Sequence, residues 1–359
     1  MFRKAYIEVN LDKIRYNVEY LKKRSDKDII GVIKANGYGT IDYMEASILK
    51  EAGISFFAVS SLDEAINLRE KGISDEILIL GCVSKDEMNI VRDNNFSIVT
   101  LSRKFVSEAD LKDVKVHLKL DTGMNRIGVE PDEARDILDV LLQKGARVEG
   151  VMSHFSSADS DLDYSNKQYE LFRNCVKSLA YDFKYIHMSA TDASLIINDD
   201  ICNYHRIGLG LLGYSAYETD LKPCIRLLAH VSMCKKLQSG ETVSYGRHYT
   251  SDGKGYLLTI PIGYADGFFR SNTGKKVFVE NEYGTIVGSI CMDQLMIHTD
   301  EYHAEDSIVE LFGEHIDIDK RAEELNTITY ELLTSLSDRL THVFIKDGKV
   351  YKEINPRNH

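Results

Sequence analysis

The sequence predicts an α/β protein in which a (β/α)8 TIM barrel is followed by a mostly β C-terminal domain. Over the first two-thirds of the chain, short apolar runs alternate with longer amphipathic stretches, a rhythm that indicates parallel strands joined by helical crossovers. After about residue 225, short β-like runs dominate instead. We therefore expect a barrel over residues 10–225 and a β-rich domain over residues 226–359, to which a strand at residues 5–9 also belongs.

The barrel prediction depends on eight short apolar runs and on the amphipathic stretches between them. The strand candidates are residues 29–34, 55–60, 76–80, 96–100, 114–120, 147–153, 183–188 and 204–210. The clearest helical stretches are residues 41–52, 62–71, 85–94, 132–144 and 165–179. Eight such units over roughly 200 residues match a (β/α)8 barrel. A doubly wound open sheet is the alternative, because the rhythm alone does not separate the two.

The C-terminal region predicts a separate, β-rich domain. Its β-like segments are residues 224–237, 242–245, 256–262, 276–280, 285–292 and 308–312. A helical stretch covers residues 320–325 and continues from Tyr330. The segment HVFIKDGKVYKEI then resembles a hairpin, because Asp347-Gly348 suits a two-residue turn.

Composition and charge narrow the class of protein. Hydrophobic residues make up 43% and charged residues 28% of the 359 residues, as in an ordinary globular protein. The net charge of -12 argues against nucleic acid and against an anionic membrane surface as partners. The six cysteines have no CxxC or zinc spacing, which indicates free thiols in a reducing compartment. With no secretory or membrane-spanning run, we expect a cytoplasmic protein without a metal site.

Polar and ionisable side chains stand at the predicted strand ends, where a barrel builds its active site. One alone is a weak signal, but five together are stronger, because barrel interiors are otherwise filled by branched apolar residues. The set consists of Lys34, Lys119 with the loop DTGMNRIG (121–128), the loop SHFSSAD (153–159), the loop HMSATDAS (187–194), and Arg206 with the loop GLGLLG (208–213).

Common catalytic motifs give little support to other reactions. GLGLLG matches G-x-G-x-x-G but lacks the first strand, the following helix and the acidic residue of a dinucleotide site. No Walker A, GxSxG or HExxH pattern is present in the sequence. The glycines instead expose N–H groups after the eighth strand, at the usual phosphate site of a barrel.

Lys34 ends a buried strand, where an unpaired ammonium is costly and its pKa falls. On this segment alone, an amine that reaches water is the simpler interpretation. A neutral amine, however, is a nucleophile that can condense with a carbonyl. A strand-end lysine opposite a phosphate cradle therefore suggests pyridoxal 5'-phosphate.

At this point the sequence resembles the alanine racemase family, pyridoxal-phosphate enzymes built from a (β/α)8 barrel and a C-terminal β domain. The resemblance covers nearly the whole chain. Its motifs are VIKANGYG, LKLDTGMNRIGV, MSHFSSAD, HRIGLGLLG, VSYGR, IPIGYADGF, CMDQ and TYEL. It implies interconversion of L- and D-alanine by two bases, with D-alanine supplied to peptidoglycan.

The resemblance implies that Lys34 holds the cofactor and acts as one base, and that Tyr245 acts as the other on the opposite face of the substrate. Tyr245 lies in the C-terminal domain, so it would serve the barrel of the second subunit of a homodimer. Arg206 matches the arginine at the pyridine nitrogen of the cofactor. A fixed cation there disfavours protonation of that nitrogen, which favours racemisation over decarboxylation.

The remaining matches complete the expected site. Arg126 corresponds to the arginine that contacts the cofactor's phenolate oxygen and the substrate carboxylate, and Lys119 to a lysine often carbamylated in the family, which would orient Arg126. His154 corresponds to a histidine that links Tyr245 to Arg206. The phosphate positions are Tyr38, Thr191, Gly208, Leu209 and Tyr330. The substrate positions are Met292 with Asp293 beside it, and Tyr264 and Tyr330, which narrow the entrance.

Two departures from the family leave alternatives open. Ala190-Thr191 stands where Asn-Ser is common, and Gly39-Thr40 where a small residue and a histidine are usual. They affect the expected cofactor affinity and side-chain preference, so a serine or broader amino-acid racemase is the first alternative. A non-catalytic carrier of the cofactor would lack Tyr245 and the C-terminal domain. A barrel-type decarboxylase disagrees with Arg206.

Overall fold

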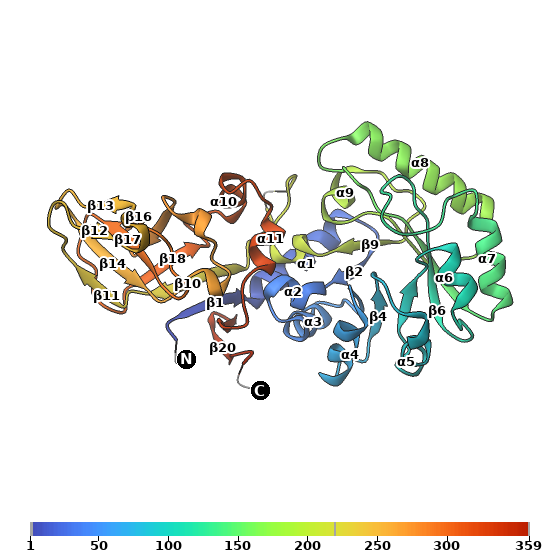
Figure 1. Cartoon of the computed structure of the whole chain (residues 1–359). Helices are drawn as coiled ribbons and strands as arrows, with labels where there is room; N and C mark the ends of the chain where they lie inside the picture. Colours follow the sequence, from blue (N-terminus) through green and yellow to red (C-terminus); the bar gives the residue numbers. More distant parts are fainter. Residues whose placement is uncertain (1–2, 219, 358–359) are drawn as a thin grey trace. The chain divides into compact units, whose positions relative to one another are not determined.

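The computed structural model describes residues 3–218 and 220–357, which divide into two compact units (Figure 1). One unit runs from Lys13 to Lys222. The other combines the described residues up to Asp12 with those from Pro223 onward.

The first unit is a closed barrel of eight parallel strands, which confirms the predicted barrel over the open sheet. Each strand coincides with one of the eight apolar runs. They are β2 (Asp28–Val32), β3 (Phe56–Val59), β4 (Glu76–Ile79), β5 (Ser97–Val99), β6 (Lys115–Lys119), β7 (Arg147–Met152), β8 (Tyr185–His187) and β9 (Tyr204–Ile207). The last strand closes the barrel by pairing with the first, with Arg206 opposite Ile30.

Helices and turns follow the strands of this unit. They are α1 (Leu11–Arg24), α2 (Lys34–Gly39), α3 (Asp42–Glu51), α4 (Leu62–Glu70), η1 (Lys85–Glu87), α5 (Met88–Asp93), α6 (Arg103–Glu108), α7 (Ala134–Gln143), α8 (Leu162–Leu179), α9 (Thr191–Ile196) and η2 (Leu209–Leu212). The sequence prediction assigned no element to α1, although Leu11, Ile14, Val18 and Leu21 repeat at helical spacing and are buried. It also overlooked α6 and α9, whose six residues each carry little periodicity.

The interior of the barrel is unusually polar. All five residues of β6 are buried, and Lys115, His117 and Lys119 alternate along it, so their side chains share one face of the strand. Lys115 Nζ lies 2.7 Å from both carboxylate oxygens of Glu76, which compensates its charge. His117 instead contacts His187, and Lys119 Nζ donates to the carbonyl oxygen of Leu120, so neither is hydrogen-bonded to a carboxylate there. Both lead towards the carboxyl end of the strands.

The second unit contains a ten-stranded sheet in the order β11-β14-β17-β16-β15-β18-β10-β1-β19-β20 and a small β12-β13 pair. β1 (Ala5–Asn10) lies inside this sheet, antiparallel to β10 and parallel to β19. The other strands are β10 (Ile225–His230), β11 (Met233–Lys235), β12 (Thr242–Val243), β13 (Tyr249–Thr250), β14 (Tyr256–Ile260), β15 (Lys276–Val279), β16 (Glu282–Val287), β17 (Leu295–Thr299), β18 (Ile308–Phe312), β19 (Thr341–Lys346) and β20 (Lys349–Ile354).

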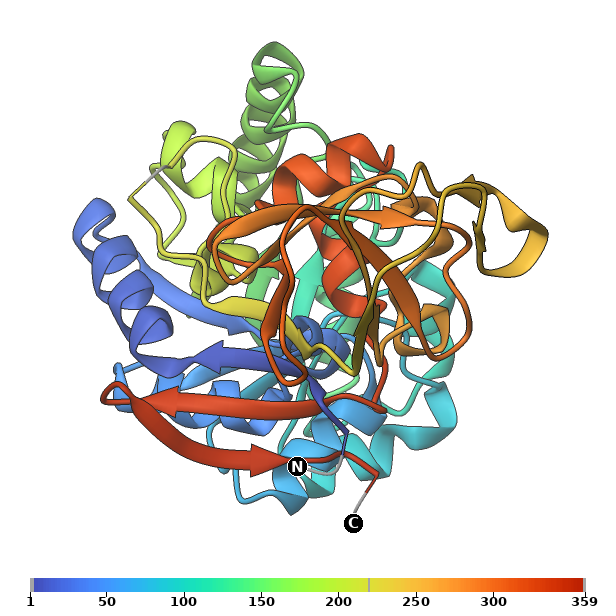
Figure 2. The same cartoon turned by 90° about the vertical axis from the view of Figure 1, so that its left-hand side faces the viewer.

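The predicted C-terminal hairpin is confirmed, and β20 forms one edge of the sheet (Figure 2, red). Asp347 and Gly348 both have positive φ, 53° and 68°, as a tight two-residue hairpin turn requires. The helical stretches of this unit are α10 (Ile318–Glu324) and α11 (Thr329–Thr334), with single turns η3 (Tyr245–Arg247), η4 (Tyr264–Asp266) and η5 (Arg270–Asn272).

One predicted β segment of this unit was wrong. Residues 285–292 were expected to be a single β run, but β16 ends at Val287 and the CMDQ motif lies in a loop. Gly288 has a φ of 68°, which takes the chain out of the extended conformation. The strand that follows, β17, begins only at Leu295 and was not predicted.

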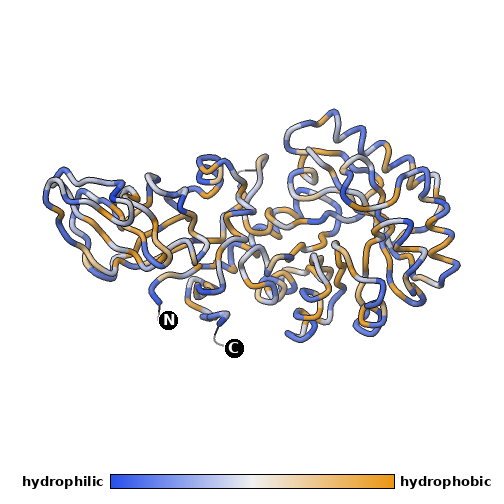
Figure 3. Tube along the Cα trace, viewed as in Figure 1, coloured by the Kyte–Doolittle hydropathy of each residue, from blue (hydrophilic) through white to orange (hydrophobic). Residues whose placement is uncertain are grey.

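Hydrophobic residues follow the strands in both units, whereas the outer helices of the barrel alternate hydrophobic and polar residues (Figure 3). In the barrel, the buried apolar residues include Ile30 on β2, Phe57 on β3, Ile77 on β4 and Val151 on β7. No helix within the described ranges is long and apolar enough to cross a membrane.

Candidate active site

Lys34 lies just beyond the carboxyl end of β2 and its side chain is half-buried. Burial lowers the pKa of its amine, and the guanidinium groups of Arg126 and Arg206 lower it further, whereas Glu64 raises it. Both arginines therefore lie close enough to influence the charge of Lys34. The structure thus brings together three residues that the sequence singled out from three separate strand ends.

The residues after Lys34 form a left-handed turn. Ala35, Asn36, Gly37 and Tyr38 have φ values of 52°, 55°, 64° and 52°. This conformation costs about 1–2 kcal/mol for each residue other than glycine. Backbone hydrogen bonds close the turn, from Gly37 N to Ile33 O at 2.9 Å and from Ile41 N to Asn36 O at 3.0 Å. The sequence predicted a turn here but gave no sign of its handedness.

Tyr38 and Gly208 form one side of a tightly packed cradle. A Cβ atom on Gly208 would lie 2.4 Å from the Tyr38 hydroxyl oxygen, so a larger residue here would displace the Tyr38 side chain. On the other side, Gly210 N donates to Thr191 Oγ1 at 3.2 Å, and a Cβ on Gly210 would lie 2.6 Å from Thr191 Cγ2. Four of the predicted phosphate positions, Tyr38, Thr191, Gly208 and Leu209, therefore gather at the ends of β2, β8 and β9.

Arg206 is buried at 3% exposure, and its guanidinium contacts four acceptors. It donates to His187 Nδ1 at 2.8 Å, to His154 Nδ1 at 2.8 Å, and to the carbonyl oxygens of Ser153 at 2.9 Å and Met188 at 2.8 Å. Burial lowers the pKa of Arg206 to about 10, so the group remains charged at neutral pH. None of these four partners is a carboxylate.

These contacts fix the tautomers of three histidines. Because Arg206 can only donate, the Nδ1 atoms of His154 and His187 must accept, and their protons lie on Nε2. His187 Nε2 then donates to His117 Nδ1 at 2.8 Å. His117 in turn carries its proton on Nε2, a buried atom without a hydrogen-bond partner. Burial, reinforced by Arg206, lowers the pKa of His117 to about 3 and those of His154 and His187 well below 6.5.

Lys119 ends β6 with its side chain almost fully buried. Its Nζ donates to the carbonyl oxygen of Leu120 at 2.6 Å, and its backbone N donates to Thr100 Oγ1 at 2.8 Å. Burial lowers the pKa of Lys119 to about 8, Asp121 opposes the shift, and Arg206 and Arg126 add to it. A fraction of this amine is therefore uncharged near neutral pH.

The predicted basic residues form a single electropositive cluster. Burial and the charges of Arg206, Arg126, Lys119 and Lys34 all lower the pKa of His154. Arg126 is exposed and lies on the loop after β6. A cluster that concentrates cations in this way favours the binding of a ligand with several negative charges.

Tyr245 and the other predicted residues of the second unit are exposed. Tyr245 is 76% exposed, Met292 53%, Tyr264 42% and Tyr330 40%. Asp293 is also exposed and pairs with Arg339 Nη2 at 2.5 Å. A groove beside Tyr245 is lined by apolar side chains, among them Met233, Leu237, Val243, Leu257 and Met296.

The backbone before Tyr245 is held in a rare conformation. Ser244 has φ 64° and ψ -176°. Residues other than glycine adopt these backbone angles only at a cost of about 1–3 kcal/mol. Two side-chain hydrogen bonds hold it, from Ser244 Oγ to Ser289 O at 2.6 Å and from Ser289 Oγ to Tyr245 O at 2.8 Å. Strained backbone of this kind is concentrated at functional sites.

Two loops that carry Tyr264 and Met292 pack against each other. Tyr264 N donates to Cys291 O at 3.1 Å and Ala265 N donates to Met292 O at 3.0 Å. A Cβ on Gly263 would lie 2.3 Å from Cys291 O, so this approach requires glycine. The GYADG and CMDQ motifs therefore form one structure, although 27 positions separate Tyr264 from Cys291.

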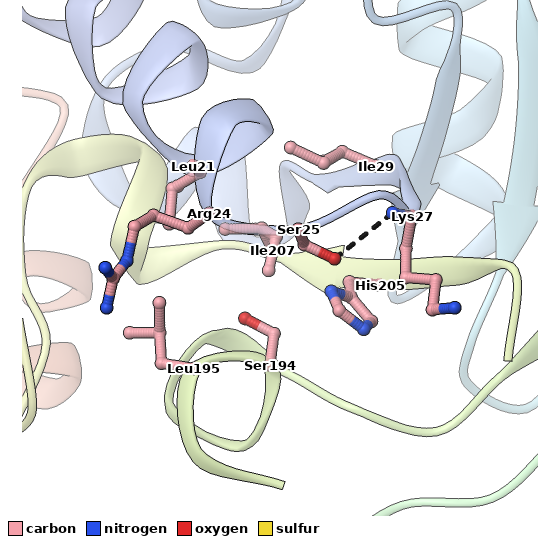
Figure 4. Close-up of a pocket in the computed structure, with 9 residues that line it drawn as sticks. All are labelled: Leu21, Arg24, Ser25, Lys27, Ile29, Ser194, Leu195, His205 and Ile207. Atoms are coloured by element: carbon pink, nitrogen blue, oxygen red, sulfur yellow. Dashed lines mark hydrogen bonds between the residues drawn. The ribbon is translucent and has the colours of Figure 1, made fainter. Parts of the chain in front are cut away.

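A pocket in the barrel unit is lined by none of the predicted site residues (Figure 4). Its charged groups are already paired, Arg24 with Glu218 at 3.6 Å and His205 with Asp199 at 3.2 Å. Its accessible volume of about 10 Å³ is enough for roughly one water molecule. It therefore offers no ligand site to compete with the cationic cluster.

Among the described residues, no group of three or more His, Cys, Asp or Glu could hold a metal ion.

Sequence reasoning missed the role of His117 and treated His187 as an ordinary structural histidine. The signal was present in β6, where KVHLK places three basic residues at a spacing of two in a fully buried strand. Such a pattern predicts polar groups that line the barrel interior.

A barrel with an amine and a buried arginine in one cationic cluster, followed by a β domain, agrees with the class of barrel-type pyridoxal-phosphate enzymes. Residues 9–216 match the alanine racemase N-terminal domain, and residues 224–344 match the alanine racemase C-terminal domain. The chain belongs to the alanine racemase family.

Individual relatives agree with this assignment. The chain is 36% identical to the alanine racemase of Staphylococcus epidermidis, over 97% of this chain and 96% of the relative. The crystal structure of alanine racemase from Bacillus anthracis with bound L-Ala-P superposes with a TM-score of 0.91 at 33% identity, covering 99% and 98% of the two chains. A histidine racemase from Leuconostoc mesenteroides superposes with a TM-score of 0.87 at 27% identity, covering 96% and 99%.

Proposed function

We propose that this chain is a pyridoxal-phosphate-dependent racemase that interconverts L- and D-alanine with Lys34 and Tyr245 as its two bases. The observation that carries the proposal is that Lys34 and a buried, charged Arg206 lie in the same cationic cluster. Membership of the alanine racemase family supports the same reaction.

The residues present fit pyridoxal 5'-phosphate. The cofactor has an aldehyde, a phosphate, a phenolate and a pyridine nitrogen. Lys34 would hold it covalently, Arg126 would face the phenolate and Arg206 the pyridine nitrogen. The fit is supported by the cradle beside Tyr38, where a Cβ on Gly208 has no room, and by the absence of a carboxylate among the four partners of Arg206. The phosphate-binding residues would be Tyr38, Thr191, Gly208, Leu209 and Tyr330.

Two proton transfers at the substrate Cα constitute the reaction. When bound, pyridoxal 5'-phosphate withdraws electrons from the Cα atom and makes its proton acidic. Burial and neighbouring cations lower the pKa of Lys34 Nζ, which suits it to accept a proton from D-alanine near neutral pH. Tyr245 Oη serves the opposite face and accepts the proton of L-alanine. Met292, through its backbone, and Arg126 bind the substrate carboxylate, while Tyr264 and Tyr330 limit the space for its side chain.

Arg206 and His154 set the protonation of the site. Arg206 presents only N–H donors and a positive charge, so it would disfavour protonation of the pyridine nitrogen that it faces. That restraint limits electron withdrawal and keeps the reaction at proton transfer instead of decarboxylation. His154 accepts from Arg206 through Nδ1, so its Nε2–H remains to donate to Tyr245.

The active unit in this proposal is a homodimer in which Tyr245 serves the barrel of the other subunit. A tyrosine that is 76% exposed cannot exclude water from its own reaction, so it needs a covering partner. The apolar groove beside it supplies surface for such a contact. A two-fold pair is the usual arrangement, and it would make two identical sites.

Lys119 is a candidate for carbamylation in this proposal. With a pKa of about 8, roughly a tenth of its amine is neutral at pH 7 and can attack carbon dioxide. The Lys119 nitrogen would form a bond to the carbon of carbon dioxide and release one proton to water, leaving an anion that orients Arg126. Asp293 would be a supporting residue near the substrate. After incubation with carbon-13-labelled bicarbonate, a carbamate signal should appear in the protein with its native Lys119 and be absent from the Lys119→Ala variant.

The cell would use the product in peptidoglycan. D-Alanine made in the cytoplasm is available for cell-wall synthesis, and six free cysteines agree with a reducing compartment.

The experiment that tests the proposal follows chirality over time. Protein loaded with pyridoxal 5'-phosphate is given L-alanine, with L-serine and L-histidine in parallel. L-Serine tests the departure at Thr191, and L-histidine is included because a histidine racemase shares the fold. Formation of D-alanine towards an equal mixture is the expected result. Conversion of another amino acid at a higher rate would make this chain a serine or broader racemase, and no conversion would favour a cofactor carrier.

A further inference from the structure

We propose that Glu45 and Thr40 are positioning residues that hold the left-handed turn after Lys34 in the shape that presents Lys34 and Tyr38 to the cofactor. We name the two side chains the Glu45–Thr40 brace. The inference rests on the proposed function, because it concerns how that site is built. All of its geometry belongs to the barrel unit.

The brace binds the turn at its centre. Thr40 Oγ1 lies 2.7 Å from Gly37 O and 3.1 Å from Glu45 Oε2. The backbone N of Thr40 donates to the same Gly37 carbonyl at 3.0 Å. Both side chains are buried, at 1% exposure each. The carbonyl in the middle of the strained turn therefore accepts two hydrogen bonds that water does not replace.

The hydrogen-bond pattern places a proton on Glu45. Thr40 has one hydroxyl proton, and the Gly37 carbonyl can only accept, so the hydroxyl donates there at the shorter distance. Thr40 Oγ1 can then bind Glu45 Oε2 only as an acceptor, which requires a protonated carboxyl group. Burial raises the pKa of Glu45 well above its usual value, and the nearby Asp42 carboxylate raises it further, so both favour the protonated group.

The other oxygen of the carboxyl group agrees with a neutral acid. Glu45 Oε1 is buried and has no hydrogen-bond partner. A carboxylate left without a partner in this position would be far more costly than a neutral carbonyl oxygen. A single direction of donation therefore runs from Glu45 through Thr40 to Gly37.

Gly37 is matched to the brace. A Cβ atom at this position would lie 2.6 Å from Thr40 Oγ1 and 2.7 Å from Glu45 Oε2. Its neighbours Ala35, Asn36 and Tyr38 adopt the left-handed conformation without glycine's freedom. Their strain must be offset by contacts, and the brace supplies the buried ones at the centre. Without it, the two ends of the turn at Lys34 and Tyr38 lose their fixed spacing.

Amide hydrogen exchange of residues 34–41 in the cofactor-free protein tests the brace without any activity assay. Thr40→Val and Glu45→Met keep the size but remove the hydrogen bonds, and each should raise exchange in the turn at least about tenfold. Glu45→Gln retains a donor for Thr40 Oγ1 and should stay within about threefold of the unmodified protein.

The dissociation constant of pyridoxal 5'-phosphate, followed by the absorbance of the bound cofactor, is the second readout. Thr40→Val and Glu45→Met should each weaken binding by about tenfold, and the double variant should be no weaker than either alone, because one network is lost only once. Multiplying effects would contradict a shared brace.

Leu141→Ala in α7 is the matched control for a general loss of stability. Leu141 is fully buried and lies outside the turn. The control should lower the melting temperature while leaving turn exchange and cofactor affinity unchanged. The inference is overturned if the control reproduces the effects of Thr40→Val, or if Thr40→Val and Glu45→Met change neither readout. An unmodified protein that binds no cofactor overturns the proposed function instead, and the exchange comparison still decides on the brace.

Discussion

The two proposed bases occupy opposite environments. Lys34 belongs to a barrel whose interior already holds a network of buried cations and neutral histidines. Tyr245 belongs to a β domain in which it is 76% exposed, beside an apolar groove. Each residue adjoins strained backbone, at Ala35–Tyr38 and at Ser244 respectively. The comparison teaches that the barrel arranges its charges by itself, whereas the environment of the tyrosine would come from the proposed dimer.

The largest effect is expected at Lys34. Lys34→Ala removes both the covalent hold on the cofactor and one base, so racemisation should fall by at least about 10³-fold. The absorbance of covalently bound cofactor should vanish with it. Activity measured by chirality and an absorbance spectrum check both, and a variant that retained them would place the nucleophile elsewhere.

Tyr245→Phe should lower racemisation by about 10²- to 10⁴-fold without changing the melting temperature, because the lost hydroxyl belongs to an exposed side chain. The two enantiomers are equal in energy, so kcat/KM falls equally in both directions. Deuterium exchange at Cα in heavy water separates the bases. D-Alanine should still exchange through Lys34, whereas exchange of L-alanine should be lost. Equal exchange of both enantiomers would remove Tyr245 from the mechanism.

Arg206→Lys tests the buried side of the comparison through stability. Lysine cannot reach all four acceptors, so buried acceptors lose their donors and the free energy of unfolding should fall by about 2–4 kcal/mol. Arg247→Lys, an exposed arginine beside Tyr245, is the matched control and should change stability by less than about 0.5 kcal/mol. Urea unfolding of both variants makes the measurement. Similar losses of unfolding free energy in the two variants would contradict a stabilising role for the hydrogen bonds of Arg206.

The last prediction is a pH dependence of stability that belongs to the barrel. Unfolded histidines titrate near pH 6.5, whereas burial lowers the pKa of His117 to about 3 and those of His154 and His187 well below 6.5. The unfolded chain therefore binds more protons below pH 6.5. Stability is complete above that pH and falls by about 1.4 kcal/mol per pH unit for each histidine as the pH decreases, continuing to about pH 3 for His117.

Urea unfolding between about pH 7.5 and pH 5 measures this slope. His117→Phe removes one of the three groups and should reduce the slope by about a third. An unchanged slope in this variant would contradict a buried, neutral His117.

The sequence predicted the barrel well because its signal is local. Each of the eight strands is a short apolar run, and Lys34, Lys119 and Arg206 stand at strand ends where topology alone brings them together. The roles assigned to Tyr245, Met292 and the other residues of the second unit came from resemblance to a family. Nothing in their local pattern distinguishes them from ordinary surface residues.

Other features could not be read from the sequence for physical reasons. The handedness of the turn at Ala35–Tyr38 depends on the buried contacts of Thr40 and Glu45, two residues outside the turn itself. The tautomers of His117 and His187 depend on the direction in which Arg206 donates. The break after Val287 depends on the φ of one glycine.

A mixture of two inactive variants tests the central claim most directly. Lys34→Ala and Tyr245→Phe chains are produced together so that they assemble as mixed dimers. If each site combines Lys34 of one subunit with Tyr245 of the other, every mixed dimer has one complete site. Racemisation should then recover to about a quarter of the unmodified activity, since half the dimers are mixed and half their sites are complete. Activity no greater than that of the separate variants would mean that both bases come from one chain, and would contradict the account.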